Sequence, residues 1–429
     1  MRLLPSAFLL ALLLPACGRG DLEDDTDGAD ADTDTDTDTD TDTDTDTDTD
    51  TDTDTDTDTD TDTDTDTDTD TDIDCDTSGL AGYTPVAYDV VQVRPSLTAR
   101  DGEVIDDTLQ GTEKLHYTMR RTDGGYDREE LFVWFGGSGS EPTNYDLILN
   151  MAVSVGYTAV ALAYDNETSV GELCGQATGE CSNENPECEG DLRYEMLYGV
   201  DTSPCFETTP ANSIENRITR LVQAAHAQAP DAGFDRYLAS DGESLDWTHI
   251  AVGGWSQGGG HAAAFSRDFL VARALFTSKA SDSSVCHVLY ADDPTVCDTD
   301  GDGLYGLDYN PDEVYVPAPW AYAPRETPGS RLFGVYHQRE EAAYFTDETF
   351  AAYGMAGADA PLNVDELVYP DAFADTYDCT HSFVSNATPS YENDAYHRAM
   401  GPDAYLSLGE DGLPLLGGPI VYALSLPVE

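Results

Sequence analysis

Residues 247–270 read WTHIAVGGWSQGGGHAAAFSRDFL and place Ser256 between an apolar run and an alanine-rich run. Trp247–Gly253 is rich in residues that favour extended structure and predicts a strand. The stretch from Gln257 to about Leu270 predicts a helix. Glycines two positions before and after the serine permit a tight turn, because a Cβ there would collide with the flanking strand and helix. The segment therefore predicts a strand, a sharp turn and a helix, with a hydroxyl at the turn.

Strands and helices alternate along the rest of the chain. The predicted strands are Lys114–Met119, Leu131–Phe135, Tyr157–Tyr164, Arg273–Ser278 and Arg331–His337, with a strand-like run at Glu366–Tyr369. Two further helices are predicted, one from Asn144 behind a cap at Thr143 and one with Pro210 in its first turn. Such alternation indicates an α/β fold with a mainly parallel sheet flanked by helices, in which ligands bind beyond the carboxyl ends of the strands.

The composition is strongly acidic. The 429 residues include 85 Asp and Glu against 19 Lys and Arg, which gives a net charge of -66. Of the acidic residues, 29 lie in 21–76, and 77–429 keeps 56 of them against 17 basic residues. A surface of this charge repels polyanions, so the composition excludes a nucleic-acid partner. At roughly 350 residues, 77–429 is long enough for a large folded domain.

The N-terminus has the features of a processing signal. Arg2 precedes an apolar run, Leu3–Leu14, that is too short to span a bilayer, and a small residue precedes Cys17. Residues 1–16 resemble a bacterial lipoprotein signal peptide. The resemblance implies a lipid on Cys17 and a membrane-anchored protein of the bacterial cell envelope, at the outer membrane or cell surface because Gly18 rather than Asp follows the cysteine. An ordinary secretory signal is the alternative.

Residues 17–76 form a segment of low complexity. From Thr33 to Asp72 the sequence consists of twenty consecutive Thr-Asp pairs, with no apolar side chain to bury. Such a segment is predicted to be disordered, and its closely spaced like charges extend the chain. We interpret it as a stalk that carries the folded domain in 77–429. Weak calcium binding and glycosylation of the threonines are the alternatives.

Nine cysteines are present, and eight remain once Cys17 is assigned to lipid. An even number in an exported chain predicts disulfides. Cys174, Cys181, Cys188 and Cys205 crowd one polar stretch, so we expect this stretch to be stapled locally, with the pairing left open. A zinc site is the alternative. Against it, no pair has the two-residue spacing of a zinc knuckle, and no histidine lies among these cysteines.

The Gly-x-Ser-x-Gly pattern around Ser256 resembles the nucleophile elbow of the α/β-hydrolases, and the resemblance covers roughly Lys114 to the C-terminus. It implies a catalytic serine followed along the chain by an acid and then a histidine. It also implies an oxyanion loop after the strand Leu131–Phe135.

A glycine-rich stretch, Gly136–Ser140, stands where the family has this oxyanion loop. The backbone N–H groups of Gly137 and Ser138, together with that of Gln257, are the donors that the resemblance implies for a tetrahedral oxyanion. The histidine that lipases carry before these glycines is absent, since Phe135 occupies its place.

In the α/β-hydrolases the general base is a histidine that follows the serine along the chain. His381 lies in a polar loop after the strand-like run that ends at Tyr369, where the family has its base, and is therefore predicted as the base. His337 lies within a predicted strand and is expected to pack. His397 lies in a later tyrosine-rich helix, where a surface or packing role is expected, and His261 on the helix after the serine is expected to be structural.

The acid of the triad normally follows the strand that here ends at His337. Glu341 has the commoner spacing from such a strand, and Glu340 is one step away on the other side of the turn. Some relatives place the acid one strand earlier, which would select Asp282. A glutamate suits the role, because the acid orients the imidazole and stabilises its charged form.

Alternating carboxylates mark a candidate calcium loop. Asp298, Asp300 and Asp302, with a glycine at the sixth position and Asp308 further on, match the opening of an EF-hand-type loop, although its twelfth position is Tyr309 rather than Glu. An acidic solvated turn is the alternative. The loop lies in the second of two expected insertions, at about 165–205 and 283–330. Calcium there would be structural, and the chemistry itself requires no cofactor.

These features predict a tethered serine hydrolase that cleaves a carboxylic ester, of the carboxylesterase or lipase-like class, through an acyl-enzyme. Two alternatives remain open. One is a serine peptidase of the same fold, because the elbow continues with Gly259. The other is a calcium-dependent binding or adhesion lipoprotein without turnover.

Overall fold

The computed structural model describes parts of one compact unit of the chain, which spans 70–429. The described residues are 82–109, 112–175, 179–182, 184–278, 282–285, 315–340, 343–358, 360–366, 380–387 and 395–426. Among these residues, none of the helices combines the length and the apolar character needed to cross a bilayer. Several predictions fall outside the described residues, namely those for 1–16, Cys17, the segment 17–76, Glu341 and the calcium ligands Asp298, Asp300, Asp302 and Asp308.

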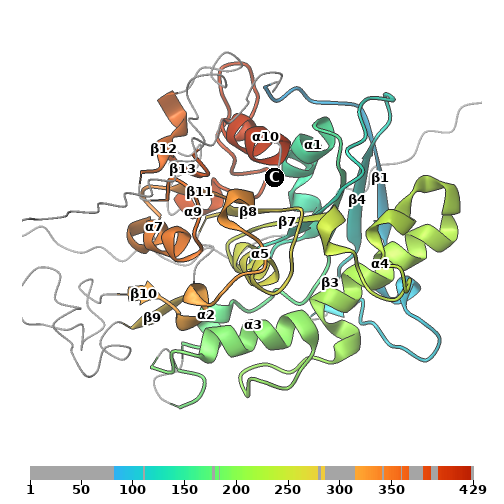
Figure 1. Ribbon diagram of the computed structural model, residues 1–429, viewed down its shortest axis with the longest axis horizontal. Helices are drawn as coiled ribbons and strands as arrows, with labels where there is room; N and C mark the ends of the chain where they lie inside the picture. Colours follow the sequence, from blue (N-terminus) through green and yellow to red (C-terminus); the bar gives the residue numbers. More distant parts are fainter. Residues whose placement is uncertain are drawn as a thin grey trace, which may run out of the picture. The chain divides into compact units, whose positions relative to one another are not determined.

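In the described part of the chain, nine strands form one mixed sheet (Figure 1). From one edge to the other they are β1 (Tyr88–Val93), β4 (His116–Arg121), β6 (Thr158–Leu162), β5 (Leu131–Phe135), β7 (Ile250–Trp255), β8 (Arg273–Thr277), β11 (Leu332–His337), β13 (Ser382–Ser385) and β12 (Leu362–Asn363). The pairs β1–β4 and β4–β6 are antiparallel, and the other neighbours are parallel. Two short ladders join β2 (Thr108–Leu109) to β3 (Thr112–Glu113), and β9 (Ser283–Val285) to β10 (Tyr315–Pro317).

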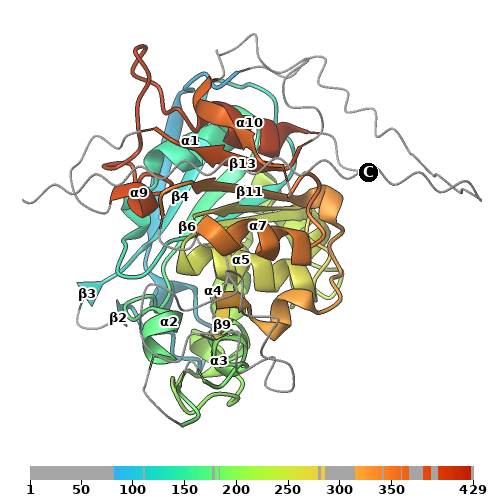
Figure 2. The ribbon, with the colours of Figure 1, turned by 90° about the vertical axis from the view of Figure 1, so that its left-hand side faces the viewer.

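Helices cover both faces of this sheet, which confirms the predicted fold class (Figure 2). α1 and α10 lie on one face, and α3, α4 and α5 lie on the other. The helices of the described residues are α1 (Asp146–Ser154), α2 (Val170–Leu173), α3 (Cys188–Tyr198), α4 (Ile214–Gln228), α5 (Gln257–Asp268), α7 (Ala343–Ala352), α9 (Ala395–Arg398) and α10 (Gly417–Ser425).

Strand β5 shows why the core has two halves. All five of its residues are buried, as expected for a central strand with helices on both sides. Because side chains alternate along a strand, Leu131, Val133 and Phe135 join the core under α3, α4 and α5, whereas Phe132 and Trp134 join the core under α1 and α10.

Two helix starts differ from the prediction because a 3₁₀ turn precedes each helix. Pro210 belongs to a separate 3₁₀ turn, Pro210–Asn212, and α4 begins later, where the Ser213 side chain accepts the Asn216 N–H at 3.3 Å. Thr143 likewise lies in a 3₁₀ turn, and Tyr145 is the residue that precedes α1.

The last part of the sheet differs more from the prediction than these helix starts do. Strand structure was expected at Glu366–Tyr369, but Glu366 ends a 3₁₀ turn that starts at Val364, and 367–370 lie outside the described residues. β13 begins at Ser382 instead and pairs in parallel with β11. His381 therefore immediately precedes a strand rather than following one.

Two disulfides staple the expected stretch. Cys174 pairs with Cys188, and Cys181 pairs with Cys205. The two bridges are adjacent, since the sulfurs of Cys188 and Cys205 are 3.7 Å apart. The prediction of local disulfides is confirmed, and it leaves no free thiolate in this cluster for the zinc alternative. Because Cys188 is the first residue of α3, the bridges fix the start of this helix.

Candidate active site

Ser256 stands at the turn between β7 and α5. Its backbone has φ 56° and ψ −122°, a region that residues with a side chain rarely occupy. A Cβ on Gly254 would overlap the carbonyl of Gly258, and a Cβ on Gly258 would overlap the carbonyl of Phe135. Close backbone contact therefore requires both glycines. The predicted order of strand, turn and helix is confirmed, although the strand begins at Ile250 because Trp247–His249 form a 3₁₀ turn.

The imidazole of His397 lies beside the Ser256 hydroxyl. Ser256 Oγ is 2.8 Å from Nε2 of His397, and Nδ1 of the same ring is 2.9 Å from Oε2 of Glu340. With its proton on Nδ1, the ring donates to the carboxylate, and Nε2 accepts from the hydroxyl. The three side chains follow β7, β11 and β13, so they meet at the carboxyl edge of the parallel strands.

Exposure is graded across this triad. The Glu340 side chain is 1% exposed, whereas the His397 side chain is 32% exposed, and Ser256 is half-buried. A carboxylate that is shielded from water orients the imidazole, and stabilises its protonated form, more effectively than an exposed carboxylate does. The serine and the imidazole remain accessible to a molecule that approaches from solvent.

Two further side chains hold His397. Ser278, which follows β8 with a φ of 58°, donates its hydroxyl to Oε2 of Glu340 and places Oγ 2.6 Å from Nδ1 of His397. Trp255 donates its indole N–H to the His397 carbonyl at 2.8 Å, and its ring packs against the imidazole at 5.1 Å between centroids. The histidine is thus held through both its ring and its backbone.

The glycine-rich loop lies against the turn, but only part of it is free to bind an oxyanion. The Gly137 N–H donates to the Tyr145 hydroxyl at 3.1 Å, so Gly137 does not fit the predicted donor role. Within the described residues, the N–H groups of Ser138 and Gln257 make no hydrogen bond. The Ser138 hydroxyl donates to the Gln257 side-chain carbonyl at 2.6 Å, which ties the loop to the turn.

The prediction of His381 as the base is wrong in this structure. His381 precedes β13, so it lies at the amino edge of the parallel strands, opposite the edge that carries Ser256. Its Nδ1 is 2.9 Å from the Leu332 carbonyl, and its ring stacks on Phe333 with 4.1 Å between centroids. Burial lowers the pKa of His381 to about 4, which keeps the ring neutral. His381 therefore acts as a packing residue.

Of the three acids considered, the structure brings Glu340 to His397. Glu340 is buried, and its other oxygen accepts the His337 N–H at 3.2 Å. Asp282 instead forms a buried ion pair with Arg193, which excludes it as the partner of His397. Glu341, the acid preferred from spacing, lies outside the described residues.

The remaining histidines pack as expected. His337 is buried at the end of β11, with Nε2 2.9 Å from the Ala387 carbonyl. His261 is buried in α5, where its ring meets Tyr164 edge-on and its Nδ1 lies 3.3 Å from an Arg193 nitrogen. Burial, and then the Arg193 charge, holds the pKa of His261 well below its usual value.

The sequence carried a signal for His397 that was missed. The run Ser382–Ser385 is a short β-favouring segment, and a strand there places His381 before it and His397 after it. Because chemistry gathers at the carboxyl ends of parallel strands, that placement selects His397. Ser278 had the same kind of signal, as a polar residue directly after β8.

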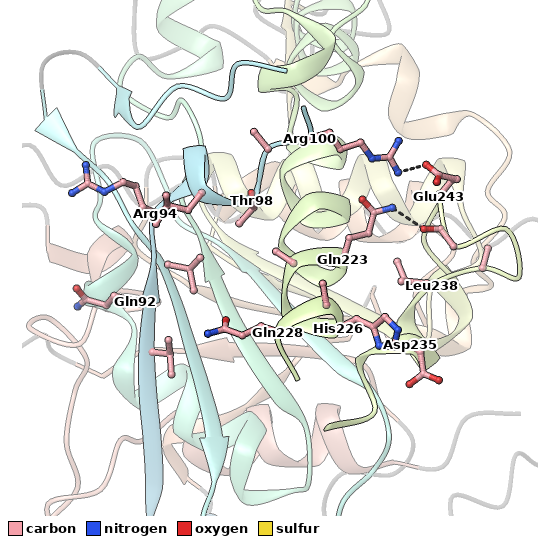
Figure 3. Close-up of a pocket in the computed structure, with 18 of the residues that line it drawn as sticks. Gln92, Arg94, Thr98, Arg100, Gln223, His226, Gln228, Asp235, Leu238 and Glu243 are labelled. Carbon is pink, nitrogen blue, oxygen red and sulfur yellow. Dashed lines mark hydrogen bonds and ion pairs between the residues drawn. The ribbon is translucent and has the colours of Figure 1, made fainter. Parts of the chain in front are cut away.

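A groove of about 1070 Å³ lies away from this site, between β1, α4 and the loop 238–243 (Figure 3). None of the triad residues lines it. Its arginines are paired, Arg100 with Glu243 and Arg94 with Glu113, and Gln223 donates to the Gly242 carbonyl. The groove offers neither a nucleophile nor an oxyanion donor that resembles those around Ser256.

Comparisons with known proteins add little to this geometry. No family model matches the chain, and none of the curated proteins matches it. Among solved structures, the chain is similar to a protein titled bacterial heroin esterase, with 17% sequence identity and a TM-score of 0.23. The match covers 46% of each chain, so the chain spans under half of that protein's length.

Proposed function

We propose that this protein is a serine hydrolase that cleaves carboxylic esters through an acyl-enzyme. The observation that carries the proposal is the continuous contact from Ser256 Oγ to Nε2 of His397, and from Nδ1 of His397 to Glu340. A serine hydroxyl is a weak nucleophile until an adjacent base accepts its proton, and a carboxylate behind that base stabilises the imidazolium.

The proposed reaction has two halves. Ser256 Oγ attacks the ester carbonyl while His397 takes the hydroxyl proton, and the N–H groups of Ser138 and Gln257 stabilise the oxyanion that forms. His397 then returns the proton to the departing alkoxide, which leaves an acyl group on Ser256. Water, deprotonated by His397, attacks this acyl group, and the carboxylic acid departs as the proton returns to Ser256.

The experiment compares the wild type with Ser256→Ala on p-nitrophenyl esters of increasing acyl length and on matched p-nitroanilides, with calcium and with a chelator. We expect ester turnover in the wild type and a loss of about a thousandfold or more in Ser256→Ala. Full ester turnover in the variant would show that Ser256 is not the nucleophile. Faster anilide cleavage would indicate a peptidase, and a folded wild type inert toward both would indicate a binding protein.

Tethering and calcium binding remain proposals that the sequence alone supports. A lipid on Cys17 would place the proposed hydrolase at the end of the Thr-Asp stalk, in the bacterial cell envelope. Calcium bound by Asp298, Asp300, Asp302 and Asp308 would order the insertion that follows Asp282. The chelator arm of the ester assay tests whether turnover depends on that ion.

A further inference from the structure

A buried ion pair lies directly behind the turn that carries Ser256. Arg193, on α3, makes a two-pronged contact with Asp282, and the exposed fraction of each side chain is 4%. The Trp320 indole also donates to Asp282 at 2.9 Å. A buried pair of this kind is expensive to desolvate and contributes little net stability compared with apolar residues. Its presence calls for a role other than stabilising the fold.

The guanidinium reaches the turn itself. Arg193 donates from Nη1 to the Gln257 carbonyl at 2.9 Å, and it packs so closely on Gly260 that a Cβ there would overlap the guanidinium. Gln257 also supplies one of the proposed oxyanion donors, through the N–H that joins it to Ser256. A charged donor on this carbonyl holds the peptide unit that joins Gln257 to Gly258, which is adjacent to the peptide unit that carries the Gln257 N–H.

The same guanidinium is linked to the opposite side of the oxyanion site. Nη1 of Arg193 lies 3.3 Å from Nδ1 of His261, and the His261 ring meets Tyr164 edge-on with 5.4 Å between centroids. The Tyr164 hydroxyl donates to the Gly136 carbonyl, at the start of the loop that holds Ser138. Arg193 therefore contacts one donor segment directly and supports the other through two packed rings.

Helix α3 brings this guanidinium into place, and the disulfides fix the start of that helix. Cys188, the first residue of α3, pairs with Cys174, and the second bridge lies against it. Glu189, in the first turn, accepts the Ser283 N–H at 2.9 Å, next to Asp282. The stapled segment therefore holds both members of the ion pair.

We propose that Arg193 is a positioning residue for the reaction proposed above, and that Arg193 and Asp282 hold the Gln257 backbone so that its N–H faces the oxyanion. This inference rests on the proposed function. A misplaced donor weakens binding of the transition state while leaving substrate binding largely intact.

The test replaces the pair by apolar residues, Arg193→Met with Asp282→Leu, which removes both charges together. Such exchanges of buried ion pairs tend to keep or raise stability, so the melting temperature is expected to stay near that of the wild type. We expect kcat on a p-nitrophenyl ester to fall by about 10- to 100-fold while KM changes by less than about threefold. The affinity for a trifluoromethyl ketone, whose adduct places an oxyanion on the same donors, should fall in parallel with kcat.

Arg273→Met is the matched control. Arg273 is equally buried, and its guanidinium also binds backbone carbonyls, those of Ala423 and Leu426, but it opens β8 at the amino edge of the sheet. We expect this variant to change stability without changing kcat. If the double variant fails to fold, kcat and the ketone affinity are compared in Arg193→Lys instead. This variant keeps a positive charge beside Asp282, but an ammonium group cannot make the two-nitrogen contact of a guanidinium.

Two failures are distinguishable. A folded Arg193 variant with the kcat and the ketone affinity of the wild type overturns the positioning role and leaves the proposed function intact. A wild type that neither hydrolyses esters nor reacts with a fluorophosphonate overturns the proposed function, and the positioning role with it.

Discussion

Ser278 shares the proton of His397 with Glu340. Its Oγ is 2.6 Å from Nδ1, slightly nearer than the carboxylate oxygen at 2.9 Å, and its own proton points to that carboxylate. The hydroxyl is a neutral acceptor, so it orients the ring but adds little to the stabilisation of a charged imidazolium. The charge that the proposed reaction needs is therefore that of Glu340.

This assignment predicts different outcomes for two neighbouring glutamates. Glu340→Gln keeps the shape of the side chain and an acceptor for the His337 N–H, but it removes the charge behind the imidazole. We expect kcat on a p-nitrophenyl ester to fall by about 100- to 10,000-fold. Glu341→Gln is the adjacent control and should retain the wild-type rate. If Glu341→Gln lost activity and Glu340→Gln kept it, Glu341 would be the acid that supports the imidazole.

At this scale the sequence identified the serine at the turn but not the histidine that lies beside it. Ser256 was found because the Gly-x-Ser-x-Gly spacing reports a local backbone requirement, which the contacts of Gly254 and Gly258 explain. His397 comes from a distant segment, and choosing it requires knowing where the last strand begins. Sequence spacing alone contains no such information about long-range contacts.

At the scale of elements, helix α1 starts against a partly buried carboxyl group. Asp403 accepts the Leu147 N–H at 3.0 Å, in the first turn of α1, and its own N–H donates to the Asn144 carbonyl. Burial, with the nearby Asp146 charge as a smaller cause, raises the pKa of Asp403 to about 7. The helix N-terminus favours the ionised form, but the cost of desolvation outweighs it.

This pKa predicts a pH-dependent effect on stability. The folded-state pKa exceeds the unfolded value of about 3.9, so ionisation of Asp403 weakens the fold as pH rises from about 4 to 7, and the full penalty applies above 7. Asp403→Asn should therefore raise the free energy of unfolding, relative to the wild type, by on the order of 3 kcal/mol more at pH 8 than at pH 4.5. Urea denaturation at both pH values measures this difference.

A difference between Asp403→Asn and the wild type that does not change with pH would contradict this account of α1. Asp411→Asn, in an exposed loop, controls for the loss of one negative charge.

Element prediction succeeded where one local pattern decides the structure. β5 was predicted with its observed bounds, because five consecutive apolar residues suit a strand that is buried on both faces. β13 was missed because its four residues, Ser382–Ser385, are too few to give a clear period and include two serines. These residues are buried because Phe383 and Val384 pack into the cores on the two faces of the sheet, next to β11.

At the scale of the whole molecule, the parallel strands decide where chemistry can occur. Strands β7, β8, β11 and β13 run in the same direction, so the segments after them meet at one edge. These segments contribute Ser256, Ser278, Glu340 and His397 in turn. The alternation of strands and helices in the sequence predicted a mainly parallel sheet with its site at the carboxyl edge. It did not predict the antiparallel edge formed by β1 and β4, or the network around Arg193, because these depend on contacts that no local sequence pattern reports.

The central claim is that His397, and not His381, activates Ser256. The most direct measurement is the rate at which a fluorophosphonate modifies Ser256, mapped by mass spectrometry, in the wild type, His397→Gln and His381→Gln, each shown to be folded by its melting temperature. We predict a loss of about a thousandfold or more in His397→Gln and a change of less than a few-fold in His381→Gln. A folded His397→Gln that reacts at the wild-type rate, or a folded His381→Gln that does not react, would contradict the account.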